Sequence, residues 1–223
     1  MHRLADHTQV HFHAVVESCT LHMENLMTKA TPGAAAPARN QLTPEDWIKA
    51  ARNLLVSRSV DAVRVEVLSK ELAVTRGSFY WHFKDRDDLL RRMLESWRDE
   101  ATEQIIYRFE RRNLTPRDLI RDLLSLPFRG VPAQEAASTE LAIRAWARRD
   151  ERVRQVLDEV DAKRLSYISQ CFSALGFGIA EARARAFALY SYELSESLLS
   201  HQGTDEQKAE RRAFMEKLLL TPN

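Results

Sequence analysis

The chain has 223 residues, of which 44% are hydrophobic and 29% are charged, a balance typical of a folded globular protein rather than a disordered one. Its net charge at pH 7 is only +1, so a uniformly basic surface is excluded and any contact with nucleic acid must use a local patch. The sequence holds no run of about 18 apolar residues, which excludes a membrane-spanning helix. Two cysteines are too few for a disulfide framework, and we expect a protein of the reducing cytoplasm.

The first forty residues differ in composition from the rest of the chain. They hold five of the seven histidines and, at residues 31–38, a stretch rich in alanine and proline that is typical of a linker. Two interpretations compete for this segment, a metal site and a flexible extension. We favour the extension, because no second pair of ligands stands at the spacing of a structural zinc site. The candidate metal ligands would be His11, His13, Cys19 and His22.

From residue 42 onward, start signals for helices recur. Thr43-Pro44 and Thr115-Pro116 each place a capping residue before a proline at the first helical position. Thr204 and Gln207 stand at the spacing of a capping box. Apolar residues follow each start at helical spacing, and no segment alternates convincingly with period two. We therefore predict an all-α fold with about nine helices after residue 40.

A helix should follow Thr43, and two short helices should lie between residues 63 and 84. The longer elements expected are Asp85 to about Arg112, Thr115 to Leu124, Thr139–Ala147, Glu151–Leu175, Ile179–Gln202 and residues 205–220, with a loop at residues 127–132. The helix that starts at Asp85 would be a rigid element joining the short helices to the C-terminal half.

The two short helices between residues 63 and 84 carry the most informative pattern. The first has an apolar stripe from Val65 to Leu72, and Ala73-Val74 forms a tight connection to the second. In the second helix Phe79 and Phe83 stand four residues apart and must point inward. The other face holds polar and aromatic side chains that cannot all be buried beside them. This arrangement predicts a helix-turn-helix, whose second helix enters the major groove of DNA.

The residue types on that outer face suit contact with DNA. Arg76 presents a rigid donor fork for guanine, Gly77 lets the backbone approach the duplex, and Lys84 reaches phosphates. Residues 64–84 carry a local charge of +2. The alternative is that the aromatic side chains simply fill a core. The candidate DNA-binding residues are Arg64, Thr75, Arg76, Gly77, Ser78, Tyr80, Trp81, His82 and Lys84.

The segment TRGSFYWHFKDRDDLL, residues 75–90, resembles the recognition helix and the following helix of TetR/AcrR-type transcriptional regulators. The resemblance extends from Trp47 to Leu94. Two places depart from the family's pattern: Ala73 stands where a turn glycine is usual, and Ser59-Val60 stands where a Gly-Tyr pair is usual. If the turn needs a positive φ, Ala73 costs about 1 kcal/mol.

The resemblance implies a division into a flexible extension (1–40), a helix-turn-helix DNA-binding domain (41–84) and a helical regulatory and dimerisation domain (85–223). It also implies a homodimer that binds an inverted-repeat operator in double-stranded DNA. An unidentified small-molecule effector would control that binding, and the protein would act as a repressor.

The regulatory half contains candidates for both implied roles, although each of these residues could instead pack inside one subunit. The candidate dimer-interface residues are Phe187, Tyr190, Leu194, Leu198, Phe214 and Leu218. The candidate residues of the ligand pocket are Trp97, Phe128, Trp146, Tyr167 and Phe172. Arg144 lies in a short helix with other arginines, and if it points inward an anionic ligand would fit.

The chain shows no motif of an enzyme, neither a nucleophile elbow nor a phosphate-binding loop, a zinc-hydrolase helix or a paired-cysteine motif. Gly176 and Gly178 favour helix punctuation, because no strand precedes them. Asp158, Glu159 and Asp161 alternate with basic residues, which predicts a solvated charged face rather than a metal cluster. We expect no catalytic residue, cofactor or metal. The alternative to a DNA-binding regulator is a helical dimer that serves as a protein-interaction module.

Overall fold

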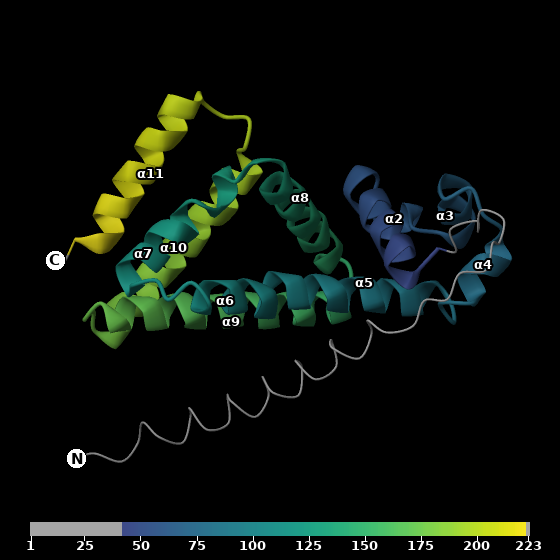
Figure 1. Cartoon of the computed structure of the whole chain (residues 1–223), viewed down its shortest axis with the longest axis horizontal. Helices are drawn as coiled ribbons and strands as arrows, with labels where there is room; N and C mark the ends of the chain where they lie inside the picture. The colour runs from purple at the N-terminus through teal and green to yellow at the C-terminus, as the bar shows by residue number, and fades with distance from the viewer. Residues whose placement is uncertain (1–41, 222–223) are drawn as a thin grey trace, which may run out of the picture. The chain divides into compact units, whose positions relative to one another are not determined.

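The computed structural model describes residues 42–221, in which every regular element is a helix, as the sequence predicts (Figure 1). The extension and the metal ligands considered for residues 1–40 lie outside the described residues. No helix between residues 42 and 221 is long and apolar enough to span a bilayer. The elements are α2 (Pro44–Ser57), η2 (Val60–Ala62), α3 (Val65–Glu71), α4 (Arg76–Tyr80), α5 (Arg86–Ala101), α6 (Glu103–Glu110), α7 (Pro116–Leu124), η3 (Leu126–Phe128), α8 (Gly130–Ala147), α9 (Glu151–Ala174), α10 (Ile179–Leu198) and α11 (Asp205–Leu220).

The predicted capping residues begin their helices as expected. Thr43 and Asp46 form a reciprocal capping box, in which each side chain accepts from the other residue's backbone N–H. Thr204 and Gln207 form the second capping box, at the start of α11. Thr115 accepts from the N–H of Asp118, with proline at the first helical position of α7. These bonds satisfy backbone donors that have no partner inside the helix.

The single helix predicted from Asp85 to Arg112 is wrong, because the chain breaks at Thr102 into α5 and α6. The Thr102 hydroxyl donates to the carbonyl of Arg98 at 2.8 Å. Nε of Arg164, on α9, donates to the carbonyl of Ala101 at 2.9 Å. Both bonds engage backbone carbonyls beside the break, and the second comes from a residue 63 positions along the chain. The local periodicity of residues 85–112 holds no sign of such a partner.

Two other helix limits differ from the sequence prediction. α8 begins at Gly130 rather than at Thr139, because Pro132 lies in the first turn, where a proline loses no helical hydrogen bond. α10 ends at Leu198, and Gly203, at φ +85°, belongs to the turn that precedes Thr204. The predicted loop at residues 127–132 is therefore shorter, and η3 occupies part of it.

The first hydrophobic core joins the helix-turn-helix to the middle of the chain. It contains Trp47 of α2, Phe79 of α4 and Trp97 of α5 together with Trp146 of α8 and Val160 of α9. The described residues also form one compact unit. The side chains of α2 to α5 thus share a core with α8 and α9, and the domain boundary after residue 84 stays a prediction.

The second core lies among α6, α7, α10, α11 and the C-terminal half of α9. Arg185 of α10 donates to the carbonyls of Leu218, Leu219 and Thr221 at 2.7–2.9 Å, and so satisfies the C-terminal end of α11. Arg211 of α11 binds Glu196 of α10 with two hydrogen bonds at 2.7 and 2.8 Å. These polar contacts fix α11 against α10.

Two residues of the helix-turn-helix adopt backbone conformations that favour glycine. Ala73 has φ +54° and ends α3 in a Schellman motif, in which the N–H of Val74 donates to the Ser69 carbonyl at 2.9 Å. Ser59 has φ +134° and ψ 171°, a region that is almost exclusive to glycine. The two departures from the family pattern therefore fall at positions where a β-carbon causes strain.

Replacing these residues with glycine should stabilise the fold. Ala73→Gly should raise the free energy of unfolding by about 1 kcal/mol, and Ser59→Gly by roughly 1–2 kcal/mol, because the strain of the β-carbon is removed. Chemical denaturation would measure both changes. Ala136→Gly, on the exposed side of α8, is the control and should lower the stability by roughly 0.5–1 kcal/mol. A loss of stability in all three variants would contradict the strain argument.

Candidate nucleic-acid interface and ligand cavity

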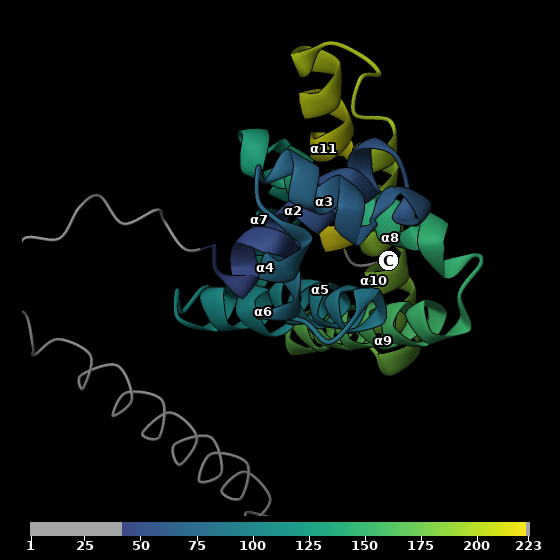
Figure 2. The same cartoon turned by 90° about the vertical axis from the view of Figure 1, so that its right-hand side faces the viewer.

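The orientation of α4 is set by aromatic packing beneath it. Phe79 is fully buried and meets Trp47 edge to face, with ring centroids 5.3 Å apart. Phe83 stacks on Phe79 at 5.3 Å, and the guanidinium of Arg92 lies 5.2 Å from the centre of the Phe83 ring. The inward position predicted for both phenylalanines is confirmed. α4 therefore presents one defined face to solvent (Figure 2).

That outer face carries the candidate DNA-binding residues. Trp81 is 86% exposed and Tyr80 is 61% exposed, values that are unusual for aromatic side chains without a partner. Ser78 and His82 are half-buried. The remaining candidates are all exposed, namely Arg64, Thr75, Arg76, Gly77 and Lys84. The structure thus brings the candidates from α4 and its flanks to the surface of one short segment.

Local contacts show which groups of this face are engaged. Thr75 stands at the N-cap of α4, but its hydroxyl makes no cap hydrogen bond, contrary to the sequence interpretation of it as a capping side chain. Arg76 donates to Glu66 of α3 at 3.0 Å, and both side chains are more than half exposed. A β-carbon on Gly77 would meet only the Thr75 hydroxyl, at 3.6 Å. Nothing within the chain therefore requires glycine at position 77.

Arg86, which the sequence analysis did not single out, secures the base of this segment. Its Nε donates to the carbonyl of Val63 at 2.6 Å, and its Nη2 donates to that of Val60 at 2.7 Å. The start of α5 is thereby fixed to η2 and to the approach to α3. A lone arginine in the sequence offers no signal that it will bind carbonyls more than twenty residues away.

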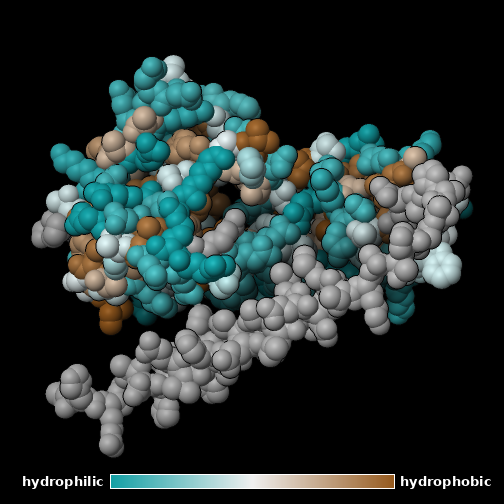
Figure 3. All heavy atoms as spheres, viewed as in Figure 1, coloured by the Kyte–Doolittle hydropathy of each residue, from teal (hydrophilic) through white to brown (hydrophobic). Residues whose placement is uncertain are grey.

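A second site is a cavity of about 670 Å³ enclosed by α6, α7, η3, α8, α9 and α10. Figure 3 shows the surface hollowed between α8 and α10. Most of the cavity wall is apolar, with Ile105, Phe109, Leu123 and Leu194 among its residues. The volume lies within the range of cavities that hold drug-sized molecules.

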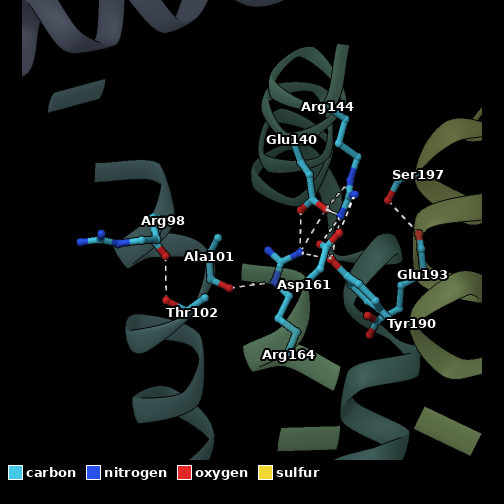
Figure 4. Close-up of polar contacts among 10 residues, drawn as sticks. All are labelled: Arg98, Ala101, Thr102, Glu140, Arg144, Asp161, Arg164, Tyr190, Glu193 and Ser197. Carbon is cyan, nitrogen blue, oxygen red and sulfur yellow. Dashed lines mark hydrogen bonds and ion pairs between the residues drawn. The ribbon is translucent and has the colours of Figure 1, made fainter. Parts of the chain in front are cut away.

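The polar part of the wall is a network of five side chains (Figure 4). Arg144 and Glu140 come from α8, Asp161 and Arg164 from α9, and Tyr190 from α10. The Tyr190 hydroxyl donates to Asp161 at 2.6 Å and accepts from both arginines at 2.8 and 2.9 Å. Glu140 accepts from Arg144 at 2.9 Å and from Arg164 at 2.8 Å. The two cations and two anions balance, and burial raises the pKa of Tyr190 above its usual range.

This network corrects two interpretations of the sequence. Arg144 does point inward, but Glu140 and Asp161 neutralise it, so it is not free for an anionic ligand. Asp161 belongs to the network and not to a solvated charged face. No cluster of His, Cys, Asp and Glu within residues 42–221 could hold a metal ion.

Of the candidate pocket residues, Tyr167 lines the cavity and the other four lie outside its wall. Trp97 and Trp146 are buried in the first core, and Phe172 is fully buried in the second. The guanidinium of Arg212 lies 5.8 Å from the centre of the Phe128 ring. The correction has a simple cause: helical spacing identifies side chains that are buried, but it does not separate a packed core from a cavity.

The candidate dimer-interface residues divide into two groups. Phe187, Leu198, Phe214 and Leu218 are 54–68% exposed, on α10 and α11. Tyr190 and Leu194 point the other way and line the cavity. Tyr190, which is 5% exposed, is the polar centre of the network described above and is removed from the proposed interface.

Comparison with known sequences identifies the N-terminal segment. Residues 48–93 match the family described as bacterial regulatory proteins, tetR family. Over 57 residues, which make up 26% of this chain, the sequence is 40% identical to the HTH-type transcriptional regulator YwcC of Bacillus subtilis (strain 168). That stretch is 26% of YwcC, so the chain matches about a quarter of the length of this relative. The family match ends at residue 93, before the first residues of the cavity.

Two crystal structures share the fold over most of the chain. A TetR-family transcriptional regulator of Rhodococcus sp. aligns with a TM-score of 0.62 and 21% identity, covering 80% of this chain and 98% of that one. The transcriptional regulator FadR of Bacillus subtilis, in complex with stearoyl-CoA, aligns with a TM-score of 0.59 and 17% identity, with the same coverage. At these identities the likeness is one of fold.

The ionic network should contribute strongly to stability. Glu140→Gln leaves two half-buried arginines with one carboxylate between them, and should lower the free energy of unfolding by roughly 2–4 kcal/mol. Thermal and chemical denaturation would measure the loss. Glu159→Gln removes the same charge from the exposed face of α9 and should change the stability by no more than about 0.5 kcal/mol. Equal effects of the two substitutions would show that the network adds nothing.

Proposed function

The chain carries the DNA-binding domain of the TetR family, and from this premise we propose that the protein is a homodimeric, ligand-responsive DNA-binding regulator that acts as a repressor in the cytoplasm. The observation that carries the proposal is the outer face of α4. Exposed Arg76, Tyr80 and Trp81 surround Gly77, where space is left without any need inside the chain. Exposed aromatic and basic groups on a second helix suit direct contact with base edges and phosphates.

Each residue of this face has a proposed role. Arg76 exchanges Glu66 for guanine acceptors, since an exposed ion pair is weak and easily replaced. Thr75 and Lys84 bind phosphates, because the Thr75 hydroxyl is not used as a cap. Gly77 allows the backbone of α4 to approach the duplex.

The exposed apolar residues of α10 and α11 support a dimer. Phe187 and Leu198 are eleven residues apart, which is close to three helical turns, so they lie on one face of α10. Phe214 and Leu218 share a face of α11 in the same way. Exposed apolar groups of this size are typical of protein contact surfaces. A symmetric pair of such faces would form a bundle of four helices.

The cavity is the proposed site of the effector, and α5 is the proposed link to DNA. The N-terminal end of α5 follows α4 directly, and its C-terminal end, at Ala101, lines the cavity. Arg164 contacts both the Ala101 carbonyl and the carboxylate of Glu140. A molecule that shifts Arg164 would also shift the end of α5, and thereby the separation of the two copies of α4 in a dimer.

The DNA-binding face can be tested by substitution. Arg76→Ala should weaken binding to the operator by roughly 1–3 kcal/mol and relax the preference at one base position. Lys84→Ala should weaken binding to all sequences alike and reduce the salt slope by about one. Titration of labelled duplexes at several salt concentrations would measure both effects.

The operator itself would be selected from a pool of random duplexes with the purified protein, and an inverted repeat is expected because the dimer has two-fold symmetry. Arg183→Ala, an exposed arginine of α10, is the control and should leave DNA binding unchanged. If no duplex is selected, or if Arg76→Ala and Lys84→Ala both bind like the wild type, α4 does not read DNA.

The proposed interface makes a separate prediction. Phe187→Glu combined with Leu198→Glu should give monomers and abolish tight operator binding, because charges cannot be buried in an apolar contact. Sedimentation velocity would measure the assembly state. Ile179→Glu, which replaces a 70% exposed residue at the other end of α10, is the matched control and should leave the dimer intact. A double variant that sediments as an undisturbed dimer would place the interface elsewhere.

A further inference from the structure

Among the described residues that line the cavity, Glu193 is a carboxylic acid for which the protein supplies no side-chain partner. Its Oε1 atom is buried and makes no hydrogen bond within the described chain. Ser197 donates to the backbone carbonyl of Glu193 at 2.9 Å and so leaves the carboxyl unpaired. In Figure 4 no contact is drawn to the Glu193 carboxyl, whereas its neighbours Tyr190 and Arg164 are fully engaged. A buried polar atom without a partner is costly, and it indicates a missing group.

The surroundings keep this acid in its neutral form when the cavity is empty. Burial raises the pKa of Glu193 to about 8, and the charge of Glu140 raises it further. Arg164 acts in the opposite direction, but its own charge is engaged by Glu140. A cation placed against the Glu193 carboxyl would reverse the effect of burial, because a nearby positive charge favours the ionised acid.

The other charged groups around the cavity do not call for an anion. Arg112 and Arg129 both pair with Asp122, at 2.6 Å each. The guanidinium of Arg111 lies 5.6 Å from the centre of the Tyr107 ring. Inside, Arg164 pairs with Glu140, and Tyr167 and Tyr190 are kept neutral by burial. The carboxyl of Glu193 is therefore the group that remains for a ligand.

We propose that the effector is an apolar molecule with a basic nitrogen, whose protonated amine pairs with the carboxylate of Glu193 inside the cavity. This inference rests on the proposed function and names the chemical class of the ligand. Ile105, Phe109 and Leu194 would surround the apolar body, within a volume of about 670 Å³. On binding, the neutral carboxyl of Glu193 would lose its proton to solvent and form the ion pair with the ammonium group.

The test compares three compounds with the same decyl chain and different head groups: decylamine, decanol and decanoic acid. Isothermal titration calorimetry of the full chain at pH 8.5 should show decylammonium binding at least tenfold more tightly than decanol, and decanoate most weakly. Affinity for decylammonium should rise at least tenfold between pH 6 and pH 8.5, since only the ionised acid pairs with the amine. The amine itself stays protonated over this range, as a lysine side chain does.

Glu193→Gln keeps the shape of the side chain and removes its charge. This variant should bind decylammonium and decanol with affinities that differ by less than threefold, and should lose the pH dependence. Glu159→Gln, on the exposed face of α9, should behave like the wild type. The wild-type comparison of the three compounds stands even if the Glu193 variant folds poorly.

Equal binding of the amine and the alcohol by the wild type, or tighter binding of decanoate, would overturn the assignment. So would a Glu193→Gln variant that retains the tenfold preference. Release of the selected operator duplex is measured separately. If decanoate binds and releases DNA, the ligand response holds and the amine assignment fails. If decylammonium binds through Glu193 without releasing DNA, the amine site holds and the proposed response fails.

Discussion

A helix of five residues cannot fix its own orientation, so the DNA-binding face of this protein depends on the burial of two phenylalanines. α4 makes too few internal hydrogen bonds to be stable alone, and the cost of forming its first turn must be offset by packing. Phe79 and Phe83 provide that packing against Trp47 of α2. Because α8 and α9 complete the same core, the direction in which α4 points is linked to the helices that lead to the cavity.

Arg164 is the residue through which the regulatory half is connected. Its guanidinium contacts the carbonyl of Ala101 at the end of α5, the carboxylate of Glu140 on α8 and the hydroxyl of Tyr190 on α10. One side chain therefore joins three helices at the wall of the cavity and touches the break at Thr102. A planar guanidinium with several fixed donors can do this, whereas a lysine ammonium would hold fewer partners in defined geometry.

The parts of the fold that the sequence predicted are those set by neighbouring residues. Capping boxes at Thr43 and Thr204 and the inward position of Phe79 and Phe83 follow from spacing alone. The site around the cavity could not be predicted in this way. Arg164, Glu140 and Tyr190 meet across 24 and 26 positions of the chain, and helical periodicity gives no register between separate helices. For the same reason Trp97, Trp146 and Phe172 carried the signal of burial, which a packed core produces as readily as a cavity does.

The exposure of Trp81 gives the protein an optical property that its other tryptophans lack. The chain has four tryptophans, and Trp47, Trp97 and Trp146 are between 0 and 7% exposed while Trp81 is 86% exposed. Indoles in apolar surroundings emit at shorter wavelengths than indoles in water, and iodide quenches only the ones it can reach. The long-wavelength, iodide-sensitive part of the emission therefore arises from α4 alone. The native side chain is a built-in reporter of whatever covers that helix, and no dye or label has to be attached.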